Sequence, residues 1–253
     1  MSAPWIPVAV NCLLLAALLV SLVSGIRFIV NRKTILARRG RVPACPLTVS
    51  DLLLLGGALG LAGVWHLTWL LPLLAVGGAV ILYRRRGVNA LAYWRCRRAA
   101  LPFYARQGLR GYLLILLPFT VSALLVAGLC QWLGVRFTQP QVDWFMELHS
   151  GRQIAGFLFL AVIIAPVWEE VIFRGVLYPF LKQRLPAGWA AVLSAAVWAA
   201  THLHWPVLLP FTLLGCALCL LYERTGKLGC PVALHAIFNL TSLLLLFFLK
   251  SMG

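Results

Sequence analysis

Two adjacent carboxylates, Glu169 and Glu170, interrupt the apolar stretch 162–178, which also contains Arg174. A charged side chain at the centre of a bilayer costs about 2.5–3.5 kcal/mol on insertion scales, so each such residue needs a partner or a function. Glu170 and Arg174 are four residues apart and can pair on one face of a helix. Glu169 lies about 100° further round that helix. The spacing therefore predicts that Arg174 neutralises Glu170 and leaves Glu169 free to face the interior of the protein.

Three more polar side chains, His202, His235 and Asn239, fall inside later apolar runs. His235 and Asn239 are four residues apart, so a helix presents their imidazole and amide groups at one point. His202 follows Trp198 by one helical turn, near the end of its apolar run. The neighbouring His204 points almost opposite to His202, and we interpret it as an interfacial residue.

These residue types are suited to hydrolysis by an activated water. A carboxylate such as Glu169 is a stronger base in an apolar cavity than in water, because burial disfavours its charged form. A nearby histidine, His202, can share the proton of the water, while His235 and Asn239 can stabilise an oxyanion. One glutamate, one histidine and a histidine–asparagine pair are sufficient for cleavage of a peptide bond inside a membrane. The same glutamate and histidines are also able to ligate a divalent metal.

Structural interpretations of these residues stay open beside the catalytic one. A glutamate–arginine pair in a membrane helix can be a structural lock, and we favour that interpretation for Glu170 and Arg174. Asn239 alone would more often form an interhelical hydrogen bond, and His235 alone would be as often structural as catalytic. The spacing by itself therefore leaves the choice between an enzyme and a structural bundle open.

The composition places these residues in a membrane protein. Of the 253 residues, 62% are hydrophobic and only 11% are charged, and the mean hydropathy is +0.93. A soluble domain would have roughly a quarter of its residues charged. The composition predicts an all-α, polytopic bundle of transmembrane helices that forms a single membrane domain.

The net charge of +16 comes from arginines and lysines in short segments that flank the apolar runs. One basic segment covers 32–41 and a second covers 84–110, with eight arginines in the second. This placement is typical of cytoplasmic loops and also attracts anionic lipid headgroups. Membrane lipids are therefore the expected partners, and nucleic acid is excluded as one.

About eight membrane segments are expected, since a span needs about 20 apolar residues. Six are single runs, at 5–26, 110–134, 153–174, 188–204, 206–223 and 232–249. The region 52–83 has basic residues on both sides, so the chain must cross twice or re-enter there, with a turn near 63–72. The first run lacks preceding basic residues and is interpreted as a helix with its N-terminus outside rather than as a cleavable signal.

Two regions differ in their content of polar side chains. Residues 1–150 are expected to form N-terminal transmembrane helices with basic cytoplasmic loops. Residues 151–253 are expected to form the functional core, because the intramembrane ionisable groups concentrate between residues 160 and 240. The loop 135–152 lies between two spans and is expected to face the outside.

Three short motifs in the C-terminal region resemble those of a known family. "EEVIFR" (residues 169–174) matches EExxxR, "WAATH" (198–202) matches FxxxH with tryptophan for phenylalanine, and "HAIFN" (235–239) matches HxxxN. Together they resemble the CPBP family, also called Abi, of intramembrane proteases that includes the Rce1-type CAAX prenyl endopeptidases. The resemblance covers roughly residues 150–245, and the first 150 residues do not share it.

The resemblance implies a role for each motif residue. Glu169 would be the general base and His202 its partner, while His235 and Asn239 would stabilise the oxyanion. A supporting set would consist of Glu170, Arg174 and Trp198. The family is usually treated as glutamic-type, so no cofactor is expected; zinc is not favoured, and if a metal were bound, Glu169, His202 and His235 would hold it.

The resulting hypothesis is an intramembrane endopeptidase of the CPBP family. Its substrate would be a membrane-associated, lipidated or C-terminally processed protein, and the expected location is a bacterial inner membrane. A non-catalytic scaffold or bacteriocin-immunity protein of the same fold is the alternative. A proton-coupled transporter is disfavoured because the N-terminal half lacks a second, symmetric set of polar interruptions.

One expectation conflicts with this hypothesis. The charges place the end of the segment 153–174, and therefore Glu169, near the cytoplasmic side. His202 ends a helix that starts on that side, and at about 1.5 Å per residue it should lie roughly 20 Å away. The two residues can meet only if one of the two helices is tilted, set low or longer than predicted.

Overall fold

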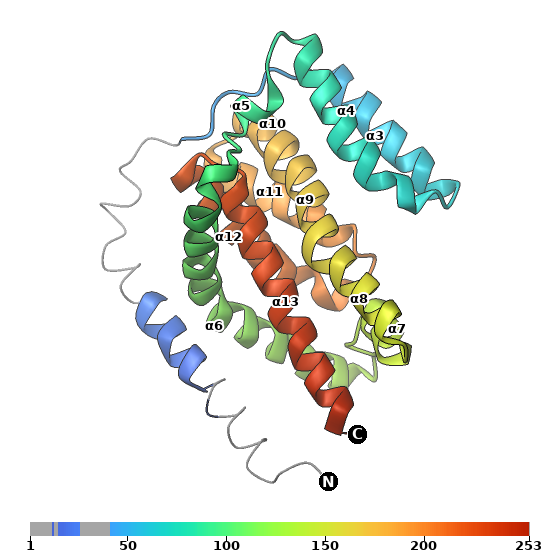
Figure 1. Cartoon of the computed structure of the whole chain (residues 1–253). Helices are drawn as coiled ribbons and strands as arrows, with labels where there is room; N and C mark the ends of the chain where they lie inside the picture. Colours follow the sequence, from blue (N-terminus) through green and yellow to red (C-terminus); the bar gives the residue numbers. More distant parts are fainter. Residues whose placement is uncertain (1–11, 13–14, 26–40, 253) are drawn as a thin grey trace.

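The computed structural model describes residues 12, 15–25 and 41–252, and within these residues the chain is a bundle of helices (Figure 1). The predicted all-α, polytopic fold is confirmed. Among the described residues, four helices are long and apolar enough to cross a membrane: Ala90–Leu133, Gly151–Lys182, Trp205–Thr225 and Gly229–Phe248. Shorter apolar helices accompany them, and the count of eight crossings, which includes such helices, stays a prediction.

The first predicted segment is described only in part, as the helix Leu15–Gly25. The buried Ser21 hydroxyl accepts a hydrogen bond from the Leu117 amide at 2.9 Å, which ties this helix to a later one. The rest of the run 5–26, and residues 32–40 of the first basic segment, lie outside the described residues.

The region 52–83 forms a helical hairpin, as its charges predict. Helix α3 (Val49–Val64) and helix α4 (Leu71–Arg85) are joined by η1 (Thr68–Leu70) and by His66, which has a φ of 54°. At about 1.5 Å per residue each helix is roughly 23 Å long, which is shorter than the roughly 30 Å hydrocarbon core of a bilayer. Because α3 and α4 run antiparallel, the start of α3 and the end of α4 lie at the same end of the bundle. The turn between them lies partway along the bundle (Figure 1).

The predicted segment 110–134 begins earlier than residue 110. A short helix α5 (Ala90–Tyr93) and η2 (Arg98–Ala100) lead into helix α6 (Leu101–Leu133), which ends at Gly134 with a φ of 67°. The residues before 110 include Tyr104, which is buried against Gly229, so packing rather than hydropathy sets the start of α6. Helix α7 (Pro140–Glu147) lies in the loop that follows.

One continuous helix of 32 residues, Gly151–Lys182, carries the EExxxR motif. It consists of α8 (Gly151–Phe159), the π-segment η3 (Leu160–Ile164), α9 (Ala165–Glu170), the π-segment η4 (Val171–Leu177) and α10 (Tyr178–Lys182). The predicted end at residue 174 is wrong. The helix continues because the following side chains, Val176, Tyr178 and Phe180, are buried, and because the π-segments adjust the backbone around the prolines.

Three helices complete the bundle: α11 (Ala187–Ala200), α12 (Leu208–Thr225, after η5, Trp205–Val207) and α13 (Gly229–Met252). Helix α12 packs against α11 and α6, and α13 packs against α6 and the Gly151–Lys182 helix. The predicted boundary at residue 150 stays a prediction, but helices from both sides of it share one bundle.

Close packing of α6 on α13 depends on Gly108. A Cβ atom at this position would lie 2.7 Å from the Leu234 backbone nitrogen and 2.8 Å from the Ala233 carbonyl carbon, and backbone atoms cannot rotate away. Small residues are the usual means by which membrane helices approach closely.

We expect Gly108→Ala to lower the thermal unfolding temperature in detergent, because overpacking of this kind costs about 1–3 kcal/mol. Gly128→Ala is the matched control, since Gly128 is on the same helix and a Cβ atom there meets nothing within 4 Å. Equal unfolding temperatures for the two variants would show that the α6–α13 contact is looser than described.

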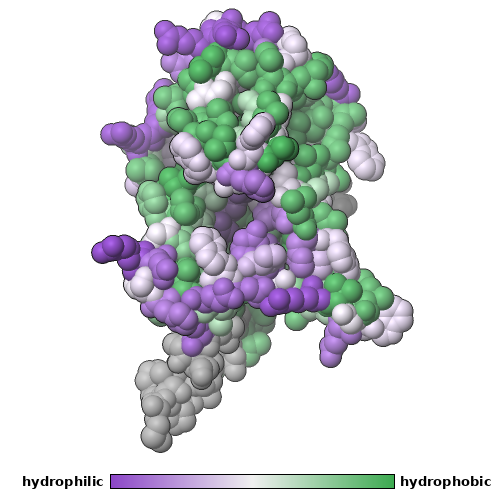
Figure 2. Space-filling model, turned by 90° about the vertical axis from the view of Figure 1, so that its right-hand side faces the viewer, coloured by the Kyte–Doolittle hydropathy of each residue, from purple (hydrophilic) through white to green (hydrophobic). Residues whose placement is uncertain are grey.

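Basic side chains gather at one end of the bundle. Arg84, Arg95, Lys182 and Arg224 lie at the ends of α4, α5, α10 and α12, which meet at the top of Figure 1. Figure 2 shows hydrophilic surface at this top end above a broad apolar region. The positive-inside rule predicts that this basic end faces the cytoplasm.

Candidate active site

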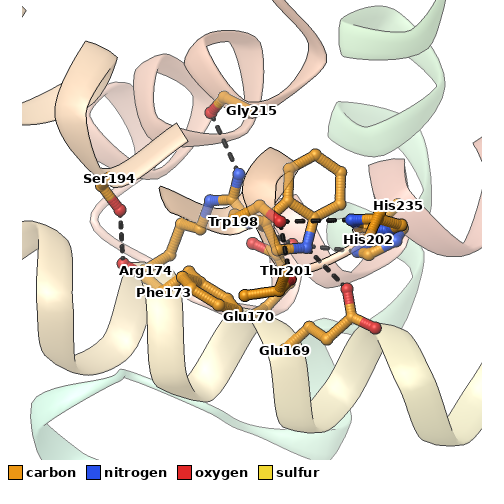
Figure 3. A network of polar contacts seen from close by, with 10 residues as sticks. All are labelled: Glu169, Glu170, Phe173, Arg174, Ser194, Trp198, Thr201, His202, Gly215 and His235. Carbon is orange, nitrogen blue, oxygen red and sulfur yellow. Dashed lines mark hydrogen bonds and ion pairs between the residues drawn. The ribbon is translucent and has the colours of Figure 1, made fainter. Parts of the chain in front are cut away.

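A cavity of about 790 Å³ lies among the helices of the bundle, and residues of all three motifs line it. Glu169 comes from the Gly151–Lys182 helix, Trp198 from α11, His202 from the turn after α11, and His235 and Asn239 from α13. The structure therefore brings together the residues that the sequence placed on three separate helices. Figure 3 shows Glu169, Trp198, His202 and His235 among them.

Helix lengths explain how Glu169 and His202 reach the same depth. At about 1.5 Å per residue, Glu169 is roughly 27 Å from Gly151 and roughly 20 Å from Lys182, so it lies well inside the bundle. Helix α11 has 14 residues and spans roughly 21 Å, which takes His202 to the same level. The extension of the glutamate helix beyond Arg174 thus resolves the conflict between the two predicted depths.

Trp198 makes the shortest side-chain contact of Glu169. Its indole Nε1–H donates to the Glu169 Oε2 atom at 2.6 Å. The same ring meets His202 and His235 edge-on, at 5.3 Å between ring centroids in each case, and stacks on Phe211 at 5.6 Å. The sequence predicted only aromatic packing here; a phenylalanine, which is the motif's usual residue, has no N–H to donate.

Glu170 and Arg174 form the predicted pair. The Arg174 guanidinium donates through Nη1 to Glu170 Oε1 at 3.0 Å, and both side chains are 0% exposed. Arg174 also donates through Nη2 to the Gly215 carbonyl at 3.2 Å, and its guanidinium lies 4.8 Å from the centroid of the Trp198 ring. Each charged group thus has a partner of opposite charge inside the bundle.

Glu170 has a second partner that its own helix does not reveal. The Nδ1 atom of His235 lies 3.0 Å from the same Glu170 Oε1 atom, and His235 is 4% exposed. A carboxylate on one ring nitrogen fixes the orientation of an imidazole. Glu170 therefore holds the His235 ring in place, with Nε2 on the side of the ring away from Glu170.

Asn239 makes the interhelical hydrogen bond that its alternative interpretation predicted. Its Nδ2 atom donates to the Ala161 carbonyl at 2.7 Å. That carbonyl lacks its usual backbone donors, because the Ala165 N–H bonds to the Leu160 carbonyl in the π-segment and Pro166 has no N–H. Asn239 thus restores a hydrogen bond that the proline removes, and the second N–H of its amide is left for the cavity.

The two histidines after α11 have different surroundings. The Nδ1 atom of His202 lies 3.2 Å from the Trp198 carbonyl, and the ring interacts electrostatically with Glu169 and His235. His204 does not line the cavity; its Nε2 atom lies 2.9 Å from the Phe137 carbonyl, which ties the α11–α12 turn to the segment after α6. Only His202 is placed to act on the cavity.

Glu169, His202 and His235 are the residues that would hold a metal ion. In the described part of the chain these three are not grouped closely enough to form such a site, and no other three His, Cys, Asp or Glu side chains are. The Trp198 N–H occupies Glu169 Oε2, and Glu170 orients His235 through Nδ1. Independence from metal stays a prediction.

Comparisons with known proteins agree with the motifs. Residues 151–241 match the family model described as type II CAAX prenyl endopeptidase Rce1-like. A Bacillus subtilis protein named "Putative membrane peptidase YdiL" is 27% identical over 82 residues, which are 32% of this chain and 34% of that protein. The chain thus spans about a third of the length of the curated relative it matches. No solved structure matches.

These matches confirm the resemblance of the C-terminal region to the CPBP proteases. They support a membrane peptidase at the level of the family, and the apolar helices support an integral membrane protein. The matched residues include every motif residue, from Glu169 to Asn239. The parts of the cavity lining that come from α6, α7, the α3–α4 hairpin and the end of α13 (Ser242, Leu243 and Leu246) lie outside the match.

Proposed function

We propose that this protein is a glutamic-type intramembrane endopeptidase of a bacterial inner membrane. It would hydrolyse a peptide bond in a membrane-associated or lipidated protein. The observation that carries the proposal is the convergence of Glu169, His202 and His235, from three segments, on one cavity that also contains the free N–H of Asn239. A structural bundle would not need so many polar groups facing one cavity.

The first step is the attack of a water molecule. Glu169 accepts one water proton while the water oxygen forms a bond to the carbonyl carbon of the substrate. His202, which faces the same cavity, holds the second water proton in a hydrogen bond. The carbonyl electron pair moves onto its oxygen, which becomes an oxyanion.

The oxyanion needs hydrogen-bond donors on the other side of the cavity. The second N–H of Asn239 is one donor, and His235 in its protonated form is the other. Its Nδ1–H donates to Glu170 and its Nε2–H to the oxyanion, so that Glu170 keeps the ring oriented while the charge develops. In the second step the carbon–nitrogen bond breaks, and the proton held by Glu169 passes to the leaving amine. Each group returns to its starting state once both products leave.

Trp198 is a positioning residue for the base in this scheme. A hydrogen bond to a charged group contributes about 1.5–3 kcal/mol, which corresponds to roughly a 10–100-fold change in rate. We therefore expect Trp198→Phe to lower kcat by roughly 10–100-fold and to leave KM unchanged. Trp205→Phe is the control, because Trp205 is partly exposed and lies away from the cavity lining. Unchanged kcat in Trp198→Phe would mean that Glu169 does not need this bond.

The proposed function is tested with the purified protein in detergent and fluorescent single-span peptides that carry apolar tails. The wild-type protein is expected to cut at least one peptide, and His235→Ala is expected to lose that activity. A scaffold or immunity protein would bind without cutting, so intact peptides in every reaction would contradict the proposal.

A chelator separates the metal-free mechanism from the metal alternative. Because Glu169 activates the water without a metal in this scheme, 1,10-phenanthroline is expected to leave the rate of cleavage unchanged. If the chelator abolishes cleavage and added zinc restores it, the metal alternative is correct and the role given to Glu169 as a base acting alone is wrong.

A further inference from the structure

We infer that the substrate enters the cavity from the end of the bundle that carries α7, opposite the basic end. The peptide bond to be cut would then belong to an uncharged segment at the outer end of a membrane-anchored protein. This inference rests on the proposed function for its chemistry, but the direction of access follows from the geometry alone.

The cavity is closed toward the basic end by buried aromatic side chains. The Tyr83 hydroxyl and the Trp94 Nε1–H both donate to the Gly175 carbonyl, at 2.6 and 3.2 Å. That carbonyl is available because Pro179, four residues later, has no N–H. A Cβ atom at Gly175 would lie 2.9 Å from Trp94 Nε1, so only glycine allows this approach.

Other large side chains at this end of the cavity are buried as well. Tyr83, Trp94, Tyr178, Tyr222 and Leu228 are each 2% exposed or less and belong to one apolar cluster. Glu170 and Arg174, just below this cluster, are 0% exposed. An extended peptide therefore has no route from the basic end to Glu169 unless this cluster separates.

Toward the other end the cavity wall consists of short or exposed elements. Gln139, Gln141 and Val142 from α7 and the residue before it line this part, and so do Thr68 and Leu71 from the turn of the α3–α4 hairpin. Gln141 is exposed and Gln139 is half-buried. Figure 2 shows a hollow on this side of the molecule, between the apolar upper part and a lower band of hydrophilic surface.

The charges identify which side of the membrane this end faces. Eight arginines lie between residues 84 and 110 at the closed end. At the open end, Arg136 is paired with Asp143 at 2.6 Å, and helix α7 contains two carboxylates, Asp143 and Glu147, and no arginine or lysine. By the positive-inside rule the closed end is cytoplasmic and the open end is extracytoplasmic.

The lining also indicates what kind of peptide fits. Phe119, Phe157 and Leu246 form apolar walls, and no lysine or arginine lines the cavity within the described residues. The amide side chains of Gln139 and Gln141 offer both donors and acceptors, which suit the main chain of an extended peptide. An uncharged, apolar tail on the outer side of a membrane anchor matches this surface better than a charged one.

Direction of access is tested by labelling with a membrane-impermeant maleimide in right-side-out and inverted vesicles that contain the full chain. Gln141→Cys, in a background with Cys12→Ser and Cys96→Ser, reports the open end. The native Cys96, which is exposed within the basic segment 84–110, reports the closed end in a Cys12→Ser background. We expect Gln141→Cys to react in right-side-out vesicles and Cys96 only in inverted ones; the reverse pattern would overturn the inference.

The side of the membrane on which the substrate is cut is tested with two single-span reporter proteins. They carry the same apolar tail on opposite sides of the membrane. Only the reporter with the outer tail is expected to be cut, and maleimide at Gln141→Cys is expected to abolish that cleavage. Cutting of the inner tail alone, or of a farnesylated cytoplasmic C-terminus, would overturn the inference and leave the proposed function standing. If neither reporter is cut, the proposed function fails, and the labelling pattern still decides the direction of access.

Discussion

Replacing Glu169 by glutamine is expected to lower the rate of peptide cleavage by about 10²–10⁴-fold, which is the usual contribution of a general base. The amide has the same shape as the carboxylate, and its oxygen can still accept the Trp198 N–H, so the site keeps its geometry. It cannot take a proton from water. The measurement is kcat for a tailed membrane peptide, with the unfolding temperature recorded for the same sample.

Glu147→Gln is the matched control for this experiment. Glu147 ends α7, is exposed and does not line the cavity, so removal of its charge should leave kcat unchanged. Binding of the uncut peptide by Glu169→Gln should also stay close to that of the wild-type protein. If Glu169→Gln turns over as fast as Glu147→Gln, then Glu169 is not the base and the proposed mechanism is wrong.

The sequence was most informative where the contacts are local. The pairing of Glu170 with Arg174 follows from a spacing of four residues on one helix, and the structure contains this ion pair. The hairpin in the region 52–83 follows from basic residues on both of its sides. Both predictions depend on the geometry of one element or on the cost of placing charges in lipid, and neither requires knowledge of the bundle.

Contacts between distant segments could not be predicted from one sequence. His235 and Glu170 are 65 residues apart, and the Asn239–Ala161 bond joins residues 78 apart. Pro166 was a usable signal, because a proline inside a helix always frees a carbonyl that needs another donor. The indole N–H of Trp198 was also visible in the sequence, but its acceptor depended on how α11 packs.

The ends of the membrane segments were predicted less well, because the prediction used only the hydropathy and the charges along the sequence. The charge of Arg174 suggested that the glutamate helix stops there, whereas its pairing with Glu170 lets the helix continue to Lys182. Glu169 is consequently deeper than the charges implied. A pair of opposite charges on one helical face therefore does not indicate the end of a helix. The Glu170–Arg174 pair lies inside the helix Gly151–Lys182, well before its end.

Removing the arginine of this pair is expected to have the largest effect on stability. Arg174→Met leaves the Glu170 carboxylate buried without its cation, and breaking a buried pair from one side costs about 3–5 kcal/mol. The variant should unfold at a much lower temperature in detergent than the wild-type protein. Arg136→Met is the control, because the Arg136–Asp143 pair is exposed, with 70% and 33% of the two side chains accessible, and such pairs contribute about 0–1 kcal/mol.

The double variant Glu170→Gln/Arg174→Met separates stability from activity. With both charges gone, no uncompensated ion is left in the core, so much of the stability lost in Arg174→Met should return. Cleavage should stay low, because a neutral amide does not hold the His235 ring as the carboxylate does at 3.0 Å. Recovery of both properties would make the pair a structural lock and nothing more. Recovery of stability alone would show that Glu170 serves His235 as well as Arg174, which is the reason for two carboxylates side by side in a membrane helix.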